Sequence, residues 1–277
     1  MFDSFYYDDL IKTALKEDMP LGDITTENTV KPGTRAKAVL IARQDAVIAG
    51  LDIFERVFKL LGQDTSFTRH VNDGDHVKNG FVFMEFEGDA SVLLKGERTA
   101  LNFLQHLSGI ATKTSEFCRA VKGLPVKIVD TRKTIPGLRH LEKYAVKAGG
   151  GSNHRFCLSD GVLIKDNHIM AAGGISKAVE QVRKGIPHSV KIEVETESLE
   201  QVQEALDAGA DIIMFDNMSY EMMKNAVKLV NKHALTEASG DIHLDSVRAV
   251  AMTGVDIISI GELTHTVKAA NISMRFI

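Results

Sequence analysis

Cysteines, long apolar runs and an excess of charge of one sign are all scarce in this sequence. Its 277 residues include only two cysteines, Cys118 and Cys157, which lack CxxC or other metal-binding spacing. Two cysteines are too few for a disulfide framework, so we expect them to be buried thiols. No apolar run approaches the length of about 18 residues that a membrane-spanning helix needs.

The N-terminal segment and the charge balance exclude further classes of protein. Residues 1–10 (MFDSFYYDDL) carry acids and aromatics where a signal peptide would need a basic segment and an apolar core, so we predict a cytoplasmic protein. Lysine and arginine number 33 and aspartate and glutamate 37, which gives a formal net charge of −4. A nucleic-acid binder that relies on bulk charge would need a cationic surplus. Any anion-binding site must therefore be a local cluster.

The sequence pattern of the first part of the chain is typical of a small domain rich in short strands. Alternating segments such as 36–43 and 82–86 are joined by turn-rich stretches such as 71–80, a pattern typical of hairpins in a small α+β sandwich. A long amphipathic helix is predicted over 98–121, because leucine and isoleucine recur there at helical spacing, at Leu101, Leu104, Leu107 and Ile110.

The second part alternates between strands and helices. Glycine stops a predicted helix just before two of the strands, at Gly209 and Gly254. Alternation with short loops favours a parallel α/β sheet closed as a barrel. The length leaves room for six or seven strands, fewer than the eight of a complete barrel. The six predicted strands are 126–131, 161–165, 190–195, 211–215, 234–237 and 255–260.

Polar residues follow these strands, and in such a barrel the carboxyl ends of the strands carry the reacting groups. The early strands deliver a cationic cluster able to grip carboxylates or phosphates, formed by Arg132, Lys133, His154, Arg155 and Lys165. Glu195 and Asp216 end later strands and suit a Mg²⁺ ion or ribose hydroxyls. Ser239, Gly240 and Gly261 follow the last two strands, where backbone N–H groups often hold a phosphate. A polyanion that carries Mg²⁺ fits both the cationic cluster and the two carboxylates.

Eight sequence blocks occur together in a fixed order. They are ED with GDIT (17–25), ERTALN (97–102), DTRKT with PG (130–137), GGGSNHR (149–155), LIKDNH (163–168), KIEVE (191–195), FDN (215–217) and LTH (263–265). In this order the sequence resembles the quinolinate phosphoribosyltransferase family, also called nicotinate-nucleotide pyrophosphorylase (carboxylating). The resemblance covers the chain from end to end.

The resemblance implies a fold and an activity. The fold would be an N-terminal open-faced α/β sandwich, over 1–110 with the C-terminal tail 266–277, and an incomplete α/β barrel over 111–265. The enzyme would join quinolinate to 5-phosphoribosyl 1-pyrophosphate and release CO₂ and pyrophosphate, giving nicotinate mononucleotide for NAD synthesis. A homodimer or higher oligomer would be the active form, and Mg²⁺ the cofactor.

The resemblance also implies roles for particular residues. Quinolinate would contact Arg132, His154, Arg155 and Lys165, with Arg98 reaching in from the neighbouring subunit. The phosphoribosyl donor would contact Lys133, Glu195, Asp216, Ser239, Gly240 and Gly261, with Mg²⁺ near Glu195 and Asp216. The catalytic residues would be Lys133, Lys165, Glu195 and Asp216.

Some alternatives stay open at the level of sequence. Glu193 shares a strand face with Glu195, so either carboxylate suits the position nearer the metal. Lys165 also suits a Schiff-base aldolase, and a non-catalytic paralogue would keep a phosphoribosyl-binding site. The family usually has Gly and Ala where this chain has Asp241 and Glu262. We expect both acids to point away from the phosphate, because a carboxylate facing it would repel it.

Overall fold

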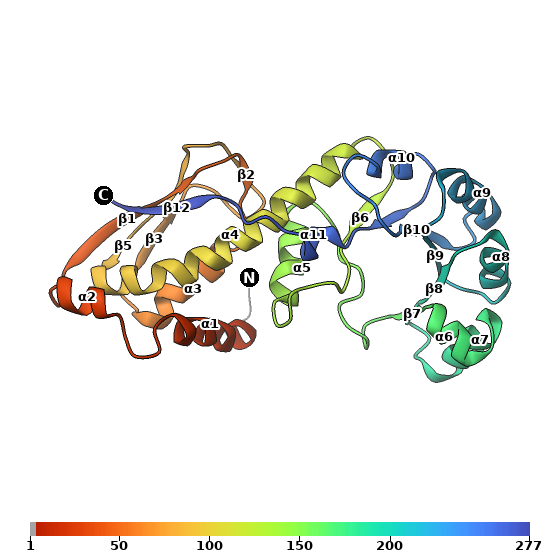
Figure 1. The fold of residues 1–277 in the computed structure, drawn as a ribbon, viewed down its shortest axis with the longest axis horizontal. Helices are drawn as coiled ribbons and strands as arrows, with labels where there is room; N and C mark the ends of the chain where they lie inside the picture. Colours follow the sequence, from red (N-terminus) through yellow and green to blue (C-terminus); the bar gives the residue numbers. More distant parts are fainter. Residues whose placement is uncertain (1–3) are drawn as a thin grey trace. The chain divides into compact units, whose positions relative to one another are not determined.

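The computed structural model describes residues 4–277, which form two compact units (Figure 1). Unit 1 comprises the chain up to Ser115 together with Pro136–Gly150 and Val267–Ile277, and unit 2 comprises Glu116–Ile135 and Gly151–Thr266. The domain division at residue 110 stays a prediction. The expectation about the leader segment rests in part on residues 1–3, which lie outside the described residues.

Unit 1 is built on a four-stranded antiparallel sheet in the order β12-β1-β5-β3. The central strands β1 (Arg35–Ala42) and β5 (Val82–Asp89) correspond to the two segments predicted from the sequence. β3 (Ser66–Arg69) pairs with β5, and β12 (Ile272–Phe276), near the C-terminus, pairs with the free edge of β1. A separate short ladder joins β2 (Ala46–Val47) to β4 (His76–Val77).

Helices accompany this sheet, and the longest confirms the predicted amphipathic helix. α4 spans Ala90–Ala120, and its leucine stripe is buried because it faces the core, with Leu104 and Ile110 fully inaccessible. α3 packs aromatic rings on the sheet, with the Phe54 and Phe58 rings both 5.5 Å from that of Phe86. The remaining helices are α1 (Ser4–Asp18), α2 (Ile24–Thr29), α3 itself (Leu51–Leu61) and α5 (Arg139–Ala148).

Unit 2 contains a parallel six-stranded sheet, which confirms an α/β fold with an incomplete barrel. The strands are hydrogen-bonded in the order β6-β11-β10-β9-β8-β7, and within the described residues no ladder joins β6 to β7 to close a ring. All six predicted strands are present: β6 (Lys127–Val129), β7 (Val162–Ile164), β8 (Ile192–Thr196), β9 (Ile212–Asp216), β10 (Leu235–Ser239) and β11 (Ile257–Ser259).

The connections of unit 2 follow the expected helix chemistry. Ser198 and Ser219 cap α8 and α9 by accepting a hydrogen bond from a backbone N–H in the first turn. Gly209 (φ +78°) and Gly254 (φ +95°) adopt the left-handed conformation at the predicted helix stops. The helices are α6 (Asp166–Ala172), α7 (Ile175–Gly185), α8 (Leu199–Asp207), α9 (Tyr220–Val230), α10 (Val247–Ala251) and α11 (Glu262–His265). From β7 onward, helices with short loops connect successive parallel strands, whereas β6 is joined to β7 through residues 130–161, part of which belongs to unit 1.

The two cysteines are half-buried free thiols, not fully buried ones as expected. Burial raises the pKa of the Cys118 thiol, which keeps it protonated and unreactive at neutral pH. Among the described residues, none of the helices combines the length and the apolar character needed to cross a bilayer.

The tight approach of Gly149 to α4 yields a test of the packing in unit 1. A Cβ at Gly149 would meet the Ala111 carbonyl oxygen and lie 2.7 Å from Thr114 Cβ. We expect Gly149→Ala to lower the free energy of unfolding by about 1–3 kcal/mol, the range for overpacking. Gly185→Ala is the control, because nothing lies within 4 Å of its added Cβ. Thermal unfolding followed by circular dichroism measures both, and equal stability of the two variants would contradict the expectation.

Candidate active site

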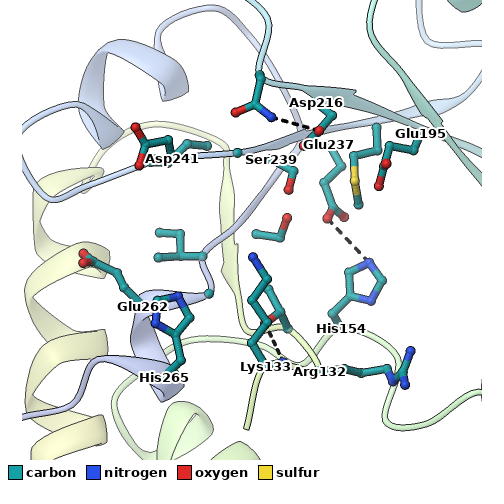
Figure 2. Close-up of a pocket in the computed structure, with 18 of the residues that line it drawn as sticks. Arg132, Lys133, His154, Glu195, Asp216, Glu237, Ser239, Asp241, Glu262 and His265 are labelled. Atoms are coloured by element: carbon teal, nitrogen blue, oxygen red, sulfur yellow. Dashed lines mark hydrogen bonds and ion pairs between the residues drawn. The ribbon is translucent and has the colours of Figure 1, made fainter. Parts of the chain in front are cut away.

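The carboxyl ends of the strands in unit 2 surround a cavity of about 760 Å³ (Figure 2). Its lining includes every candidate residue from the sequence except Arg98, namely Arg132, Lys133, His154, Arg155, Lys165, Glu195, Asp216, Ser239, Gly240 and Gly261. Arg98 lies on α4 in unit 1, where its side chain is exposed. The parallel topology thus gathers side chains from six strands at one edge.

Arg132 and Lys133 both reach the cavity because they follow the end of β6. Neighbouring residues inside a strand would point to opposite faces, but β6 ends at Val129. The Lys133 N–H donates to Thr131 Oγ1 (3.0 Å), and the Thr264 hydroxyl donates to the Lys133 carbonyl (2.7 Å). These bonds fix the backbone that presents the lysine.

Asp130 fixes the second cationic segment, a role that sequence reasoning missed. Its side chain is completely buried, and it accepts hydrogen bonds from the His154 N–H (3.0 Å) and from the side-chain amide of Asn153. A buried carboxylate needs such donors to offset its desolvation. The signal in the sequence was an acid directly after a buried strand.

Arg155 shows that this corner of the cavity favours an anion. Its Nη1 donates to the Gly161 carbonyl at 2.9 Å, which holds the guanidinium in place. Burial, followed by the positive charge of Arg132, lowers the pKa of Arg155. Two guanidinium groups that repel each other in a half-buried site are stabilised by a bound carboxylate or phosphate.

A buried acidic pair lies beside His154. The His154 Nε2 lies 3.0 Å from Glu193 Oε2 and 3.5 Å from Glu237 Oε1. Burial, followed by the negative charge of Glu193, raises the pKa of Glu237 to about 8. Within residues 4–277 these three side chains are the group whose donor atoms lie close enough together to surround a metal ion.

The acidic side of the cavity is formed by Glu195 and Asp216. Glu195 Oε2 forms an ion pair with Lys165 Nζ, whereas Glu193, on the same strand, lies outside the cavity lining. Asp216 Oδ2 accepts a hydrogen bond from the Asn217 side chain at 2.9 Å. A lysine and two carboxylates therefore line the same side of the cavity.

His168 and His265 have supporting roles. His168 Nδ1 accepts the Lys165 backbone N–H at 3.0 Å and so caps α6. His265 lines the cavity, with Nδ1 2.6 Å from Thr266 Oγ1. Capping therefore accounts for His168, whereas His265 is exposed on the cavity wall.

Gly240 and Gly261 lie so close to neighbouring side chains that an added Cβ would press against them. Gly240 has φ +94°, and a Cβ there would lie 2.5 Å from Asn217 Cγ. A Cβ on Gly261 would lie 3.1 Å from Lys133 Cδ and 3.0 Å from the His265 ring. Glycine at both positions therefore lets the backbone pack closely against these side chains of the cavity wall.

The two unusual acids beside these glycines are held by a histidine. Asp241, at φ +46°, lies 3.0 Å from His243 Nε2, and Glu262 Oε2 lies 3.5 Å from His243 Nδ1. The hydrogen bond to Asp241, followed by that to Glu262, raises the pKa of His243. Figure 2 shows both carboxylates pointing away from Ser239 and Lys133, the orientation expected from the sequence.

The raised pKa of Glu237 predicts a pH dependence of stability. Between about 4.3, the ordinary pKa of a glutamic acid, and about 8, the native state holds one proton more than the unfolded state. The free energy of unfolding should therefore fall as the pH rises through this range, by at most about 1.4 kcal/mol per pH unit. Glu237→Gln should flatten this slope in urea unfolding, whereas the exposed control Glu221→Gln should keep it. An unchanged slope in Glu237→Gln would contradict the assignment.

Comparison with known proteins places this site in a family. The chain matches "Quinolinate phosphoribosyl transferase, N-terminal domain" over residues 23–108 and "Quinolinate phosphoribosyl transferase, C-terminal domain" over residues 110–275. A relative from Bacillus subtilis (strain 168), named probable nicotinate-nucleotide pyrophosphorylase (carboxylating), is 48% identical over 258 residues, covering 93% of this chain and 89% of the relative. A relative of the same name from Methanocaldococcus jannaschii is 40% identical over 97% of this chain and 96% of its own length.

Solved structures agree with these relatives. The crystal structure of NadC from Streptococcus pyogenes has a TM-score of 0.96 and 42% identity, covering 99% of this chain and 97% of that chain. Nicotinate-nucleotide pyrophosphorylase from Ehrlichia chaffeensis has a TM-score of 0.93 and 41% identity, with both chains covered completely. Matches to both domain families and to relatives along nearly the whole length confirm the family expected from the sequence motifs. The chain therefore belongs to the quinolinate phosphoribosyltransferase family.

Proposed function

We propose that this protein transfers the phosphoribosyl group of 5-phosphoribosyl 1-pyrophosphate to quinolinate, with release of CO₂ and pyrophosphate. The product is nicotinate mononucleotide, for de novo NAD biosynthesis. The observation that carries this proposal is the cavity, which combines a cluster of cations with two carboxylates and a glycine-lined edge. A small dicarboxylate and a phosphorylated sugar match these surfaces.

Quinolinate would bind among the cations. Arg132, Arg155 and Lys165 supply bidentate and point-charge contacts for its two carboxylates, and His154 lies beside them. In this proposal Arg98 comes from the partner subunit of a homodimer or larger oligomer. That assembly and a cytoplasmic location remain predictions from the sequence.

The phosphoribosyl donor would bind along the glycine-lined edge. Ser239, Gly240 and Gly261 offer backbone N–H groups to the 5′-phosphate, and Lys133 lies against Gly261. Glu195 and Asp216 face the ribose. A carboxylate there offsets positive charge that develops on the sugar as the leaving group departs.

The reaction needs no general base from the protein. The pyridine nitrogen attacks C1 of the ribose with its own lone pair, and the C1–O bond breaks with its electrons leaving on pyrophosphate. The ribosylated ring is cationic, so it accepts the electron pair left when the adjacent carboxylate departs as CO₂, and a proton then takes its place. Holding both substrates in line contributes to the rate, by about 7–11 kcal/mol in favourable cases.

The donor set at Glu195 and Asp216 fits Mg²⁺. Both residues offer carboxylate oxygens, which Mg²⁺ prefers together with water and substrate oxygens. The ion pair with Lys165 neutralises part of the negative charge of Glu195. When bound, Mg²⁺ would stabilise negative charge on the departing pyrophosphate. The buried group of His154, Glu193 and Glu237 fits it less well, because one of its three donors is a nitrogen.

The Schiff-base alternative is disfavoured by the ion pair of Lys165 with Glu195. The Nζ of Lys165 contacts the Glu195 carboxylate, whereas a Schiff-base lysine must present its amine to a substrate carbonyl. A non-catalytic paralogue would have the same cavity and would bind a phosphoribosyl ligand without converting it.

The direct test is an assay with purified protein, quinolinate, phosphoribosyl pyrophosphate and Mg²⁺. We expect equimolar CO₂ and nicotinate mononucleotide, and little product when nicotinate replaces quinolinate, because nicotinate lacks the second carboxylate that the cations grip. Lys133→Met is the inactive control. Absence of product across pH and divalent metals would refute the proposal, and borohydride trapping of Lys165 would point to the aldolase alternative.

The orientation of Asp241 predicts a specific kinetic result. Its side chain is 86% exposed and paired with His243, so Asp241→Gly should leave the KM for phosphoribosyl pyrophosphate within about twofold, as expected for an exposed ion pair. Gly240→Ala is the matched variant, since its Cβ would meet Asn217 at a positive φ, and its KM should rise more than tenfold, about 1.4 kcal/mol. A large drop in KM for Asp241→Gly would show that the acid intrudes on the phosphate.

A further inference from the structure

We propose that Glu237 is a positioning residue of this site. Together with Glu193 it holds the imidazole of His154 in one orientation, with Nε2 facing the two carboxylates. The ring N–H then donates to a protein carboxylate and not to the substrate. The consequences for substrate binding rest on the proposed function, whereas the orientation itself rests on the structure alone.

Both ring nitrogens of His154 are already engaged by the protein. The Arg155 backbone N–H donates to Nδ1 at 2.8 Å, and Nε2 lies 3.0 Å from Glu193 Oε2. A nitrogen that accepts a hydrogen bond carries no proton, so the proton of the neutral ring lies on Nε2. This tautomer leaves neither nitrogen to donate to a ligand carboxylate in the cavity.

The acidic pair is deeply buried and comes from two separate strands. The Glu193 and Glu237 side chains, on β8 and β10, are only 4% and 1% exposed, and that of His154 is 13% exposed. Glu193 Oε1 has no hydrogen-bond partner and lies out of solvent. Glu237 Oε1 likewise lies out of solvent without a hydrogen-bond partner, so its contact with His154 Nε2 at 3.5 Å is the polar contact that this oxygen makes with the ring.

Glu237 acts on the site through His154, which separates it from Arg155. The ring links the acidic pair to the Arg155 backbone, and the Arg155 guanidinium lines the cavity. Without Glu237 the ring keeps only Glu193 at Nε2, so its orientation is less restricted and Arg155, which binds the dicarboxylate in the proposed function, is held less firmly. In this arrangement Arg132, Arg155 and Lys165 bind the substrate carboxylates. His154 keeps a fixed orientation between the acidic pair and Arg155 and does not bind the substrate itself.

The orientation is tested by ¹⁵N NMR of the full-length protein labelled at histidine. The His154 signals are assigned by their loss in His154→Gln. We expect the neutral Nε2–H tautomer in the free protein and no change of tautomer on adding quinolinate. An imidazolium, or the Nδ1–H tautomer, in either state would overturn the proposal. Because the free protein is measured first, failure of quinolinate to bind would count against the proposed function and leave this result standing.

Variants test whether Glu237 does the positioning. Glu237→Ala removes the polar contact at 3.5 Å from His154 Nε2, so it should replace the single tautomer by a mixture and raise the KM for quinolinate about tenfold. The KM for phosphoribosyl pyrophosphate should stay within about twofold, since its site lies on other residues. Glu237→Gln keeps the size and neutrality of the protonated acid, so it should restore the tautomer and most of the affinity.

If Glu237→Ala fails to fold, Glu237→Gln still tests whether Glu237 positions His154. Glu237→Gln is nearly isosteric, and loss of the Nε2–H tautomer in that variant would contradict the proposal by itself. An equal rise of both Michaelis constants in Glu237→Ala would indicate general disruption of the site and would also overturn it.

Discussion

The parallel direction of six strands is the constraint on which the site depends. Strands that all run the same way end at the same edge of their sheet, so residues far apart in the sequence, such as Arg132, Glu195 and Ser239, line one cavity. From β7 onward this direction is preserved because helices, two of them capped by Ser198 and Ser219, return the chain to the opposite edge between successive strands. Without that order, the cations would be scattered over the surface of a protein with a net charge of −4.

A concentrated cationic site is costly to build, and buried carboxylates offset much of that cost. Asp130 holds the His154 backbone and the Asn153 side chain, Glu195 pairs with Lys165, and the charge of Glu193 acts on Arg155. Each carboxylate fixes a cation or its backbone in place before the substrate arrives. Preorganised charge of this kind gives more binding and catalysis than the same charges on flexible chains in water.

Local signals predicted much of the fold. The period of the leucines predicted α4, and glycines followed by β-branched segments predicted the helix stops and all six parallel strands. The ends of several strands shifted by one to three residues, as with 126–131, which is a strand only over Lys127–Val129. Strand ends depend on which neighbours supply hydrogen bonds, and the sequence of one strand does not contain that information. The burial of Cys118 was overestimated for the same reason, since exposure depends on packing.

The sequence by itself determined the family, the succession of strands along the chain and the residue types at their ends, because periodicity and short motifs are local properties. Only the tertiary structure decided which side chains lie against each other. It placed Glu237 beside Glu193 and Asp130 under His154, and it turned Asp241 toward His243. These pairings join residues on different strands and loops, so their distances follow from sheet order and burial and have no signature in the spacing of the sequence.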